Sequence, residues 1–201
     1  MSVLPQGSAS EMTEVKLSRA AGVAGPTIIL LLISLFGISY IISTLLGFPV
    51  SLNLQFVLRV AGSVLVLMGL TIAGWTFKYR SPSDMLVSSY VTFTKLFRGK
   101  RIAERLGRKE PLVIVGLQRY VRNPLYLAVI IITFGWALVG GYTFVLLATV
   151  ILLLWFRVVL IPFEEKELLA LFGEQYAEYK DEVPMLVPFT KRKKRARLGA
   201  S

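Results

Sequence analysis

The sequence predicts an all-α polytopic membrane protein with about four transmembrane helices. Its residues are 55% hydrophobic and its mean hydropathy is +0.65. Several apolar stretches are far longer than a helix in a soluble core requires. The chain contains neither Cys nor His, which excludes disulfides, thiolate nucleophiles, imidazole bases and the commonest zinc sites. Any chemistry therefore relies on carboxylates, Arg, Lys, Tyr or a bound cofactor, and no metal site is expected.

Hydrophobic segments are spread evenly along the chain, so composition marks no boundary between domains. We expect a single membrane domain over residues 1–189. The tail over residues 190–201 contains six basic residues and no acidic ones, which suits it to anionic lipid headgroups. Residues 1–18 lack the basic region and short apolar core of a cleaved signal peptide, so the first hydrophobic segment is expected to remain as a span.

Two spans are expected in the first half of the chain, over residues 24–48 and 54–77, with Pro49 marking the turn between them. A third and a fourth, over residues 125–139 and 142–161, are separated only by Gly140 and Gly141. They should therefore form a tight antiparallel hairpin. The third is short for a full crossing, so we expect it to begin inside the sequence RNPLY at residues 122–126.

The distribution of charge predicts the orientation. Between Lys78 and Arg122 there are eleven basic residues and three acidic ones, whereas the two opposite connections carry no charge. Because basic loops face the cytoplasm, both termini are expected there, in a cell membrane or, in a eukaryote, the endoplasmic reticulum. The net charge of +11 is thus a feature of the cytoplasmic membrane side. A nucleic-acid partner is not expected, since no soluble basic fold is visible.

Two amphipathic cytoplasmic helices are also expected. In the long loop, four apolar residues fall at helical spacing ahead of a basic cluster: Leu86, Tyr90, Phe93 and Phe97. After the fourth span, the sequence EEKELLALFGEQYAEYK at residues 164–180 places apolar side chains on one broad face: Leu168, Leu171, Phe172, Tyr176 and Tyr179. We expect this second helix to pack against the cytoplasmic end of the spans.

Charged residues at the cytoplasmic ends of the hairpin are the candidates for chemistry. Arg119 and Arg122 precede its first helix, and Glu164 and Glu165 follow its second, so the hairpin brings them to one membrane face. Pro124 and the residue before it suit the first turn of a helix, whose amides can hold an anion or a polar ligand. A purely structural interpretation remains open, in which the arginines mark the membrane boundary and the glutamates start a helix.

The order of two motifs resembles the group of isoprenylcysteine carboxyl methyltransferases and phospholipid methyltransferases. The first motif is LVIVGLQRYVRNPLYLA at residues 112–128, and the second is EEKELLALFGEQYAEYKDEVPMLVPF at residues 164–189. Together with the hairpin between them, they cover residues 111–189. The resemblance implies a membrane enzyme that uses S-adenosylmethionine, with its cofactor region over residues 110–189.

Site residues are implied by the same resemblance. The residues expected to bind the cofactor are Leu112, Val113, Gln118, Arg122, Asn123, Pro124, Leu125, Tyr126, Glu164 and Glu165. Gln118 stands where the family usually has tyrosine, and Leu160 stands where eukaryotic members place an arginine that holds the substrate. Arg157 lies one helical turn earlier, on approximately the same face, and is the candidate on the substrate side.

The function implied is methyl transfer to a lipophilic acceptor, either the carboxylate of a prenylcysteine-like compound or a lipid. One alternative is an NADPH-dependent membrane reductase related to sterol reductases, although those enzymes usually continue as NYFGE where this chain reads Leu125, Tyr126, Leu127 and Ala128. Another alternative is a non-catalytic membrane scaffold whose arginines and tail bind anionic lipid.

Overall fold

The computed structural model describes residues 6–79, 114 and 116–188, and within these ranges every regular element is a helix. Three helices are long and apolar enough to cross a membrane, and a shorter apolar helix accompanies them. The three long segments are Gly25–Leu45, Phe56–Tyr79 and Thr143–Phe172, and the shorter helix is Pro124–Gly140. The prediction of an all-α polytopic membrane protein is therefore confirmed.

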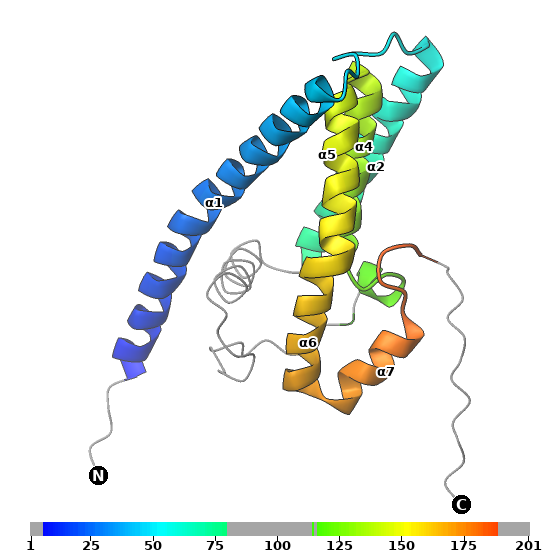
Figure 1. Cartoon of the computed structure of the whole chain (residues 1–201). Helices are drawn as coiled ribbons and strands as arrows, with labels where there is room; N and C mark the ends of the chain where they lie inside the picture. The colour runs from blue at the N-terminus through cyan, green and yellow to red at the C-terminus, as the bar shows by residue number, and fades with distance from the viewer. Residues whose placement is uncertain (1–5, 80–113, 115, 189–201) are drawn as a thin grey trace, which may run out of the picture.

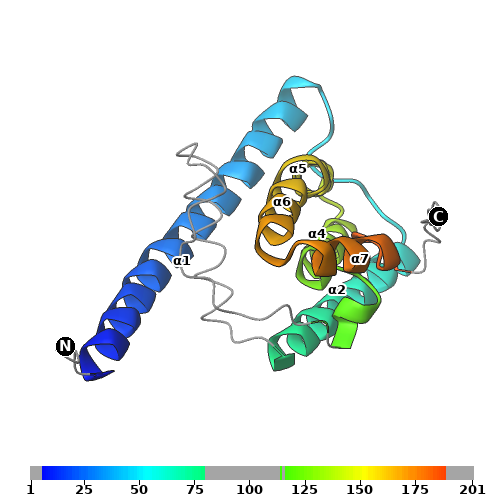
Figure 2. The ribbon, with the colours of Figure 1, turned by 90° about the horizontal axis from the view of Figure 1, so that it is seen from below.

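Helix α1 (Gln6–Leu45) stands apart from the other helices along most of its length. It meets α5 (Thr143–Trp155) near the end of α1 that precedes Gly47, where Tyr40 packs edge-on against Phe144 with ring centroids 5.6 Å apart. Toward its beginning, α1 diverges from the other helices (Figures 1 and 2), which are α2 (Phe56–Tyr79), α4 (Pro124–Gly140), α5 and α6 (Ile161–Phe172). The helix begins long before residue 24, where the first span was predicted to start.

Helices α2 (Phe56–Tyr79) and α4 (Pro124–Gly140) pack closely because glycines face each other. A methyl group added at Gly62 would lie 2.7 Å from the carbonyl oxygen of Gly135, and one at Gly135 would lie 2.6 Å from that of Gly62. One added at Gly69 would lie 2.5 Å from Ile132. Small residues let membrane helices approach in this way, so that dispersion contacts hold them together.

Helices α4 and α5 (Thr143–Trp155) form the predicted hairpin, and α4 begins at Pro124, inside RNPLY as expected. The turn is tied to the connection between α1 and α2 by backbone contacts that we call the outer latch. Leu52 donates to the carbonyl of Gly141 at 2.7 Å, and Thr143 donates to that of Val50 at 3.3 Å. Ser51 and Tyr142 form an antiparallel bridge between these two bonds.

The helix that contains α5 continues past residue 161, where the fourth span was predicted to end. A π turn, η2 (Phe156–Leu160), joins α5 to α6 (Ile161–Phe172), and the amide of Ile161 donates to the carbonyl of Phe156. Pro162 follows directly and has no amide hydrogen, which explains why the regular bonding pattern changes here rather than elsewhere. The prediction of a helix end at this position is wrong, because the wider turn accommodates the proline.

The second amphipathic segment is two helices, not one. Gly173 (φ 55°, ψ −126°) ends α6, and α7 (Glu174–Glu182) turns back at an angle to it (Figure 1). Because the turn redirects the chain, the predicted apolar face is divided: Leu171 is exposed, whereas Tyr176 and Tyr179 are buried with Val183. The amphipathic helix predicted around residues 86–97 lies outside the described residues.

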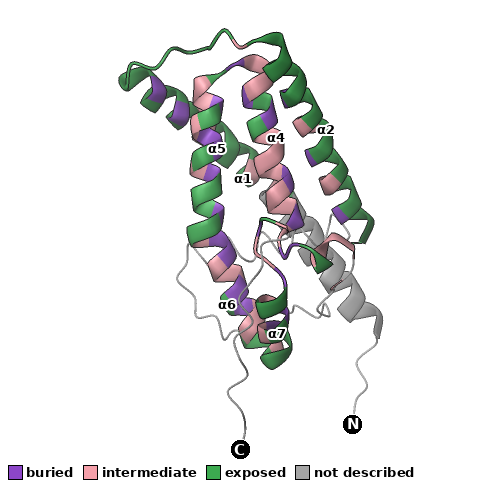
Figure 3. Ribbon diagram, turned by 90° about the vertical axis from the view of Figure 1, so that its right-hand side faces the viewer, coloured by how far each residue is buried: buried purple, intermediate pink, exposed green. Residues whose placement is uncertain are grey.

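Burial follows the same arrangement (Figure 3). The outward faces of the long helices carry exposed large apolar side chains, as expected for surfaces that contact lipid. One buried apolar cluster joins α5, η2, α6 and the chain after α7: Leu152, Phe156, Leu160, Ile161 and Leu186. The buried charged residues lie beyond this cluster, near α6 and α7 and away from the turn between α4 and α5.

Candidate active site

The segment before α4 pairs with the chain that follows α7. The amide of Arg122 donates to the carbonyl of Pro184 at 2.9 Å, and the amide of Asn123 donates to that of Met185 at 3.3 Å. The side-chain amide of Asn123 also donates to Met185, at 3.2 Å, and makes no capping bond to α4. Asn123 therefore joins two segments of the chain. It does not cap α4, although its position before Pro124 suits a capping residue.

Arg122 is the central cation of the site. Its guanidinium donates to Oε1 of Glu165 through Nε at 2.9 Å and Nη2 at 2.5 Å. Through Nη1 it also donates to the backbone carbonyls of Lys180, at 2.6 Å, and Val183. Only 1% of the Arg122 side chain is exposed. We call these contacts the Arg122 clamp, because one side chain joins α6, the end of α7 and the start of α4.

Glu165 has a second cationic partner on α7. Lys180 Nζ lies 2.7 Å from Oε2 of Glu165, so each carboxylate oxygen contacts a different cation. The Glu165 side chain is 4% exposed, whereas that of Lys180 is 32% exposed. A buried carboxylate needs such compensation because it has lost its hydration. Glu165 is thus fully engaged within the protein.

Glu164, the other member of the carboxylate pair, points to a different partner. The hydroxyl of Tyr126 donates to Oε1 of Glu164 at 2.9 Å, which joins the first turn of α4 to that of α6. The ring of Tyr126 also packs against Phe156, with centroids 4.7 Å apart. Glu164 is less buried than Glu165. Adjacent carboxylates therefore have distinct surroundings, one enclosed by cations and one held by a phenol.

Helix η1 (Gly116–Arg119) contacts α7 next to the clamp. Tyr179 donates to the backbone carbonyl of Gln118 at 2.7 Å, and its ring packs with Tyr176 at a centroid distance of 5.8 Å. Burial raises the pKa of Tyr179 to about 12, although the Arg122 cation opposes this. Burial, with the nearby Glu165 carboxylate, also raises the pKa of Tyr176 above its usual value. Both phenols are neutral at physiological pH.

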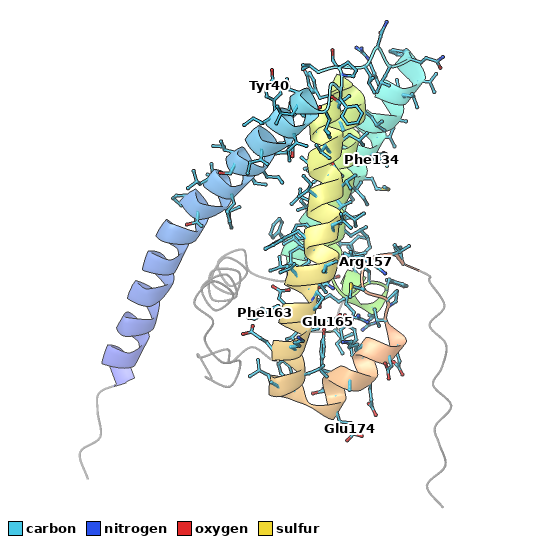
Figure 4. All side chains as sticks on the ribbon, viewed as in Figure 1. Tyr40, Phe134, Arg157, Phe163, Glu165 and Glu174 are labelled. Atoms are coloured by element: carbon cyan, nitrogen blue, oxygen red, sulfur yellow. The ribbon has the colours of Figure 1, made fainter. Side chains whose placement is uncertain are left out.

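The two arginines of RYVRNPLY do not share a helical face. Arg119 ends η1 and is exposed, whereas Arg122 lies in the irregular segment that follows and is buried. Arg157 likewise does not share a face with Leu160, since Arg157 is exposed and Leu160 is 3% exposed. Both residues lie in the π turn, which changes the angle between successive side chains around the helix axis. In Figure 4, Arg157 lies above Glu165 along the long helix.

The remaining predicted residues divide into two groups. Pro124, Leu125, Tyr126, Glu164 and Glu165 lie together where α4 and α6 begin. Leu112 and Val113 lie outside the described residues. Figure 4 shows Glu165 and Phe163 projecting from opposite sides of α6.

Sequence reasoning missed Lys180 and the role of the carbonyls after α7. The sequence alone predicts no role for Lys180, yet it contacts the buried Glu165. A usable signal was its position: a basic residue in the last turn of α7 can interact with both carbonyls and nearby carboxylates.

Comparison with known proteins assigns the family. The model of the phospholipid methyltransferase family matches residues 57–175, more than half of the chain. The chain belongs to this family. The resemblance found in the two motifs is therefore confirmed, and it extends back through α2.

Two relatives have more specific names. The chain is 38% identical over 84 residues to a methanethiol S-methyltransferase of Crocosphaera subtropica, covering 37% of this chain and 28% of the relative. It is 30% identical over 129 residues to a methanethiol S-methyltransferase of Mycobacterium tuberculosis, covering 60% of this chain and 50% of the relative. The aligned parts thus span half or less of these two methanethiol S-methyltransferases. No solved structure matches the chain.

Proposed function

We propose that this protein transfers a methyl group from S-adenosylmethionine to a lipophilic acceptor at the cytoplasmic face of a membrane. The observation that carries the proposal is the contact between Tyr126 and Glu164, which joins the two family motifs in space. It lies beside a carboxylate that two cations hold in place. If both motifs bind one cofactor, they must lie close together in the fold, as Tyr126 and Glu164 do.

The roles proposed for the residues follow their contacts. Glu164, Tyr126 and the start of α4 over residues 123–125 would hold the cofactor, together with Gln118, Leu112 and Val113. Arg122 and Glu165 also belong to this site, where they bind each other, Lys180 and backbone carbonyls near the end of α7. We assign them the role of positioning residues that fix α6 and α7 against the start of α4.

The residues present suit a ligand that carries amino and hydroxyl donors. Glu164 is a carboxylate acceptor, and the side-chain oxygen of Gln118 is shielded from solvent without a donor. S-adenosylmethionine supplies a methyl group on a sulfonium, which reacts when an acceptor is held in line with it and water is excluded. This chemistry needs no nucleophilic side chain, which agrees with a chain that lacks Cys and His.

The acceptor is proposed by class. The apolar outer surface of the helices allows a lipid or a prenylcysteine-like compound to arrive from the membrane, with exposed Arg157 as the candidate for a carboxylate or phosphate. A second candidate is a small thiol, favoured by the names of the two relatives and by buried apolar Leu160 at the position of the family's substrate arginine. Methyl transfer assays with lipid, prenylcysteine and methanethiol would distinguish these acceptors.

The orientation is part of the proposal. The basic residues between Lys78 and Arg122 and in the tail support a cytoplasmic site and cytoplasmic termini. Anionic headgroups are the expected lipid partners of these basic segments.

Binding of the product analogue S-adenosylhomocysteine to purified protein in nanodiscs tests the proposal. Glu164→Gln should weaken binding by about 1.5–3 kcal/mol, because a charge-assisted acceptor becomes a neutral one. This corresponds to roughly ten- to a hundredfold in Kd. Glu174→Gln is the matched control, since Glu174 is an exposed carboxylate at the start of α7 (Figure 4).

Calorimetry with both ligands separates the alternatives. Binding of NADPH without binding of S-adenosylhomocysteine would support the reductase, and binding of neither would support the scaffold. Equal affinity of wild type and Glu164→Gln for S-adenosylhomocysteine would contradict the assignment of Glu164.

A further inference from the structure

The π turn η2 lies between two contacts made by one side chain. Phe156 is the first residue of the turn, and its amide still donates to the carbonyl of Leu152, as in a regular α-helix. Its ring packs against Tyr126, with centroids 4.7 Å apart. Glu164, beyond the turn, accepts a hydrogen bond from the Tyr126 hydroxyl at 2.9 Å. Because one tyrosine contacts both residues, Phe156 and Glu164 must lie on the same side of the long helix.

A regular α-helix would not place these two residues on one side. Glu164 follows Phe156 by eight positions, and at roughly 100° per residue their side chains would point about 80° apart. Phe163 follows Phe156 by seven positions, which would leave only about 20° between them. In a regular helix, therefore, an apolar ring and not a carboxylate would face the Tyr126 hydroxyl.

The π turn contains one extra residue and so changes the register of the helix beyond it. The amide of Ile161 donates to the carbonyl of Phe156, whereas a regular helix would bond it one residue later. Glu164 thereby takes the angular position that a regular helix gives to Phe163. Burial agrees with this shift. In a regular helix Ile161 would point roughly 140° away from Phe156, yet Ile161 is 0% exposed and belongs to the same buried cluster.

Pro162 explains why the turn occurs at this position. Proline has no amide hydrogen, and in a regular helix its ring would collide with the carbonyl of Val158. We propose that Pro162 is a positioning residue that maintains the π turn. Through this turn Glu164, and not Phe163, faces Tyr126 and completes the cofactor site. The role rests on the proposed function, because Pro162 acts through Glu164.

Pro162→Ala, studied in nanodiscs, is the first test, because alanine permits a regular helix. In molecules that adopt it, the Glu164 carboxylate turns away from Tyr126, so affinity for S-adenosylhomocysteine should fall roughly three- to thirtyfold. The thermal midpoint of the ligand-free protein should stay unchanged or rise, since the best helix former replaces a proline. Val158→Ala is the matched control: Val158 is 67% exposed in the same turn, and its substitution should change neither quantity.

Removal of the extra residue should restore binding. In a double variant that lacks Val158 and carries Pro162→Ala, a regular helix has the register that the π turn provides in the wild type. Glu164 then faces Tyr126 again, and affinity should return to within about threefold of the wild-type value. A residue that contributed only to stability would not be rescued by a deletion.

The register can also be measured without a ligand, because the chain contains no Cys. Tyr126→Cys is combined with either Glu164→Cys or Phe163→Cys, and each pair is treated with a short bifunctional thiol reagent. With Pro162 present, the pair that includes Glu164→Cys should cross-link more efficiently. With Pro162→Ala, cross-linking should shift toward the pair that includes Phe163→Cys.

The outcomes separate the register, its purpose and the proposed function. If Pro162→Ala keeps the wild-type cross-link, Pro162 does not maintain the turn and the proposal is wrong. If the cross-link shifts without a loss of affinity, or a folded double variant does not regain affinity, the register does not serve the cofactor site and the proposal is again wrong. If the wild type does not bind S-adenosylhomocysteine, the proposed function itself is wrong, whatever the cross-links show.

Discussion

The two ends of the α4–α5 hairpin are fastened by different kinds of interaction. At one end, the outer latch joins Gly141 and Thr143 to the chain before α2 through backbone hydrogen bonds. At the other end, the Arg122 clamp uses a buried guanidinium, a carboxylate and an ammonium group. The latch joins neutral groups, mainly backbone amides and carbonyls with the Thr143 hydroxyl donating to the carbonyl of Pro49, whereas the clamp depends on the charge of particular side chains.

The latch end therefore contributes mainly to stability, whereas the clamp end also forms the candidate site. The bonds of the latch join neutral groups, so pH and salt should affect them less than they affect the charged clamp. Charged side chains can be arranged for a ligand, but each is costly when its partner is lost. The candidate site is therefore at the end where substitutions and titration have the larger effects.

The largest effect is expected from Arg122→Ala. Removal of the guanidinium leaves Glu165 buried with Lys180 as its remaining cation, and such losses cost about 3–5 kcal/mol. Thermal midpoint and affinity for S-adenosylhomocysteine should fall together. Arg119→Ala is the control, because Arg119 is exposed and its loss should cost about 1 kcal/mol or less and be screened by salt. Greater damage from Arg119→Ala at high salt would reverse the two roles.

A smaller loss is expected at the latch from Gly141→Ala. Gly141 has φ of 67°, and an added methyl group would collide with the Leu52 carbonyl, so we expect a cost of about 1–3 kcal/mol. The loss should be independent of salt, and affinity for S-adenosylhomocysteine should be preserved under conditions where the variant is folded. A change in affinity comparable to that of Glu164→Gln would show that the two ends are coupled.

Alkaline pH should destabilise the fold through the buried tyrosines at the clamp end. The pKa of Tyr179 is about 12 in the folded protein, against 10 in the unfolded chain, so its neutral form stabilises the fold fully below pH 10. As pH rises from 10 to 12 the unfolded chain ionises first, and up to roughly 1–3 kcal/mol is lost. Because the pKa of Tyr176 is also raised, Tyr179→Phe should make this part of the pH profile of unfolding less steep without removing the slope, with Tyr142→Phe at the latch as the control. An identical profile for wild type and Tyr179→Phe would contradict the role of this phenol.

Elements set by local patterns could be predicted from the sequence. The hairpin follows from apolar segments separated by Gly140 and Gly141, and the start of α4 follows from Pro124. The proximity of residues 122 and 165 also follows, because a hairpin brings its two ends together.

Features that depend on three-dimensional packing could not be predicted. Whether Pro162 ends a helix or is absorbed by a π turn depends on how neighbouring helices support the distorted turn. Pairing of Lys180 with Glu165 depends on the change of chain direction at Gly173. The apolar periodicity of the segment predicts one continuous helix and does not reveal this turn. The unsatisfied oxygen of Gln118 depends on where the donors of the described residues lie, which the sequence does not give.

The contact between Gly62 and Gly135 limits how the sequence of this protein can change over time. At most buried contacts, a larger side chain on one helix is tolerated when a smaller one replaces its neighbour. Here each glycine already faces the carbonyl oxygen of the other, within 2.7 Å and 2.6 Å of an added methyl group. Since neither position can become smaller, no second substitution at the partner position can compensate for the first. The two positions can drift only if the axes of α2 and α4 move apart.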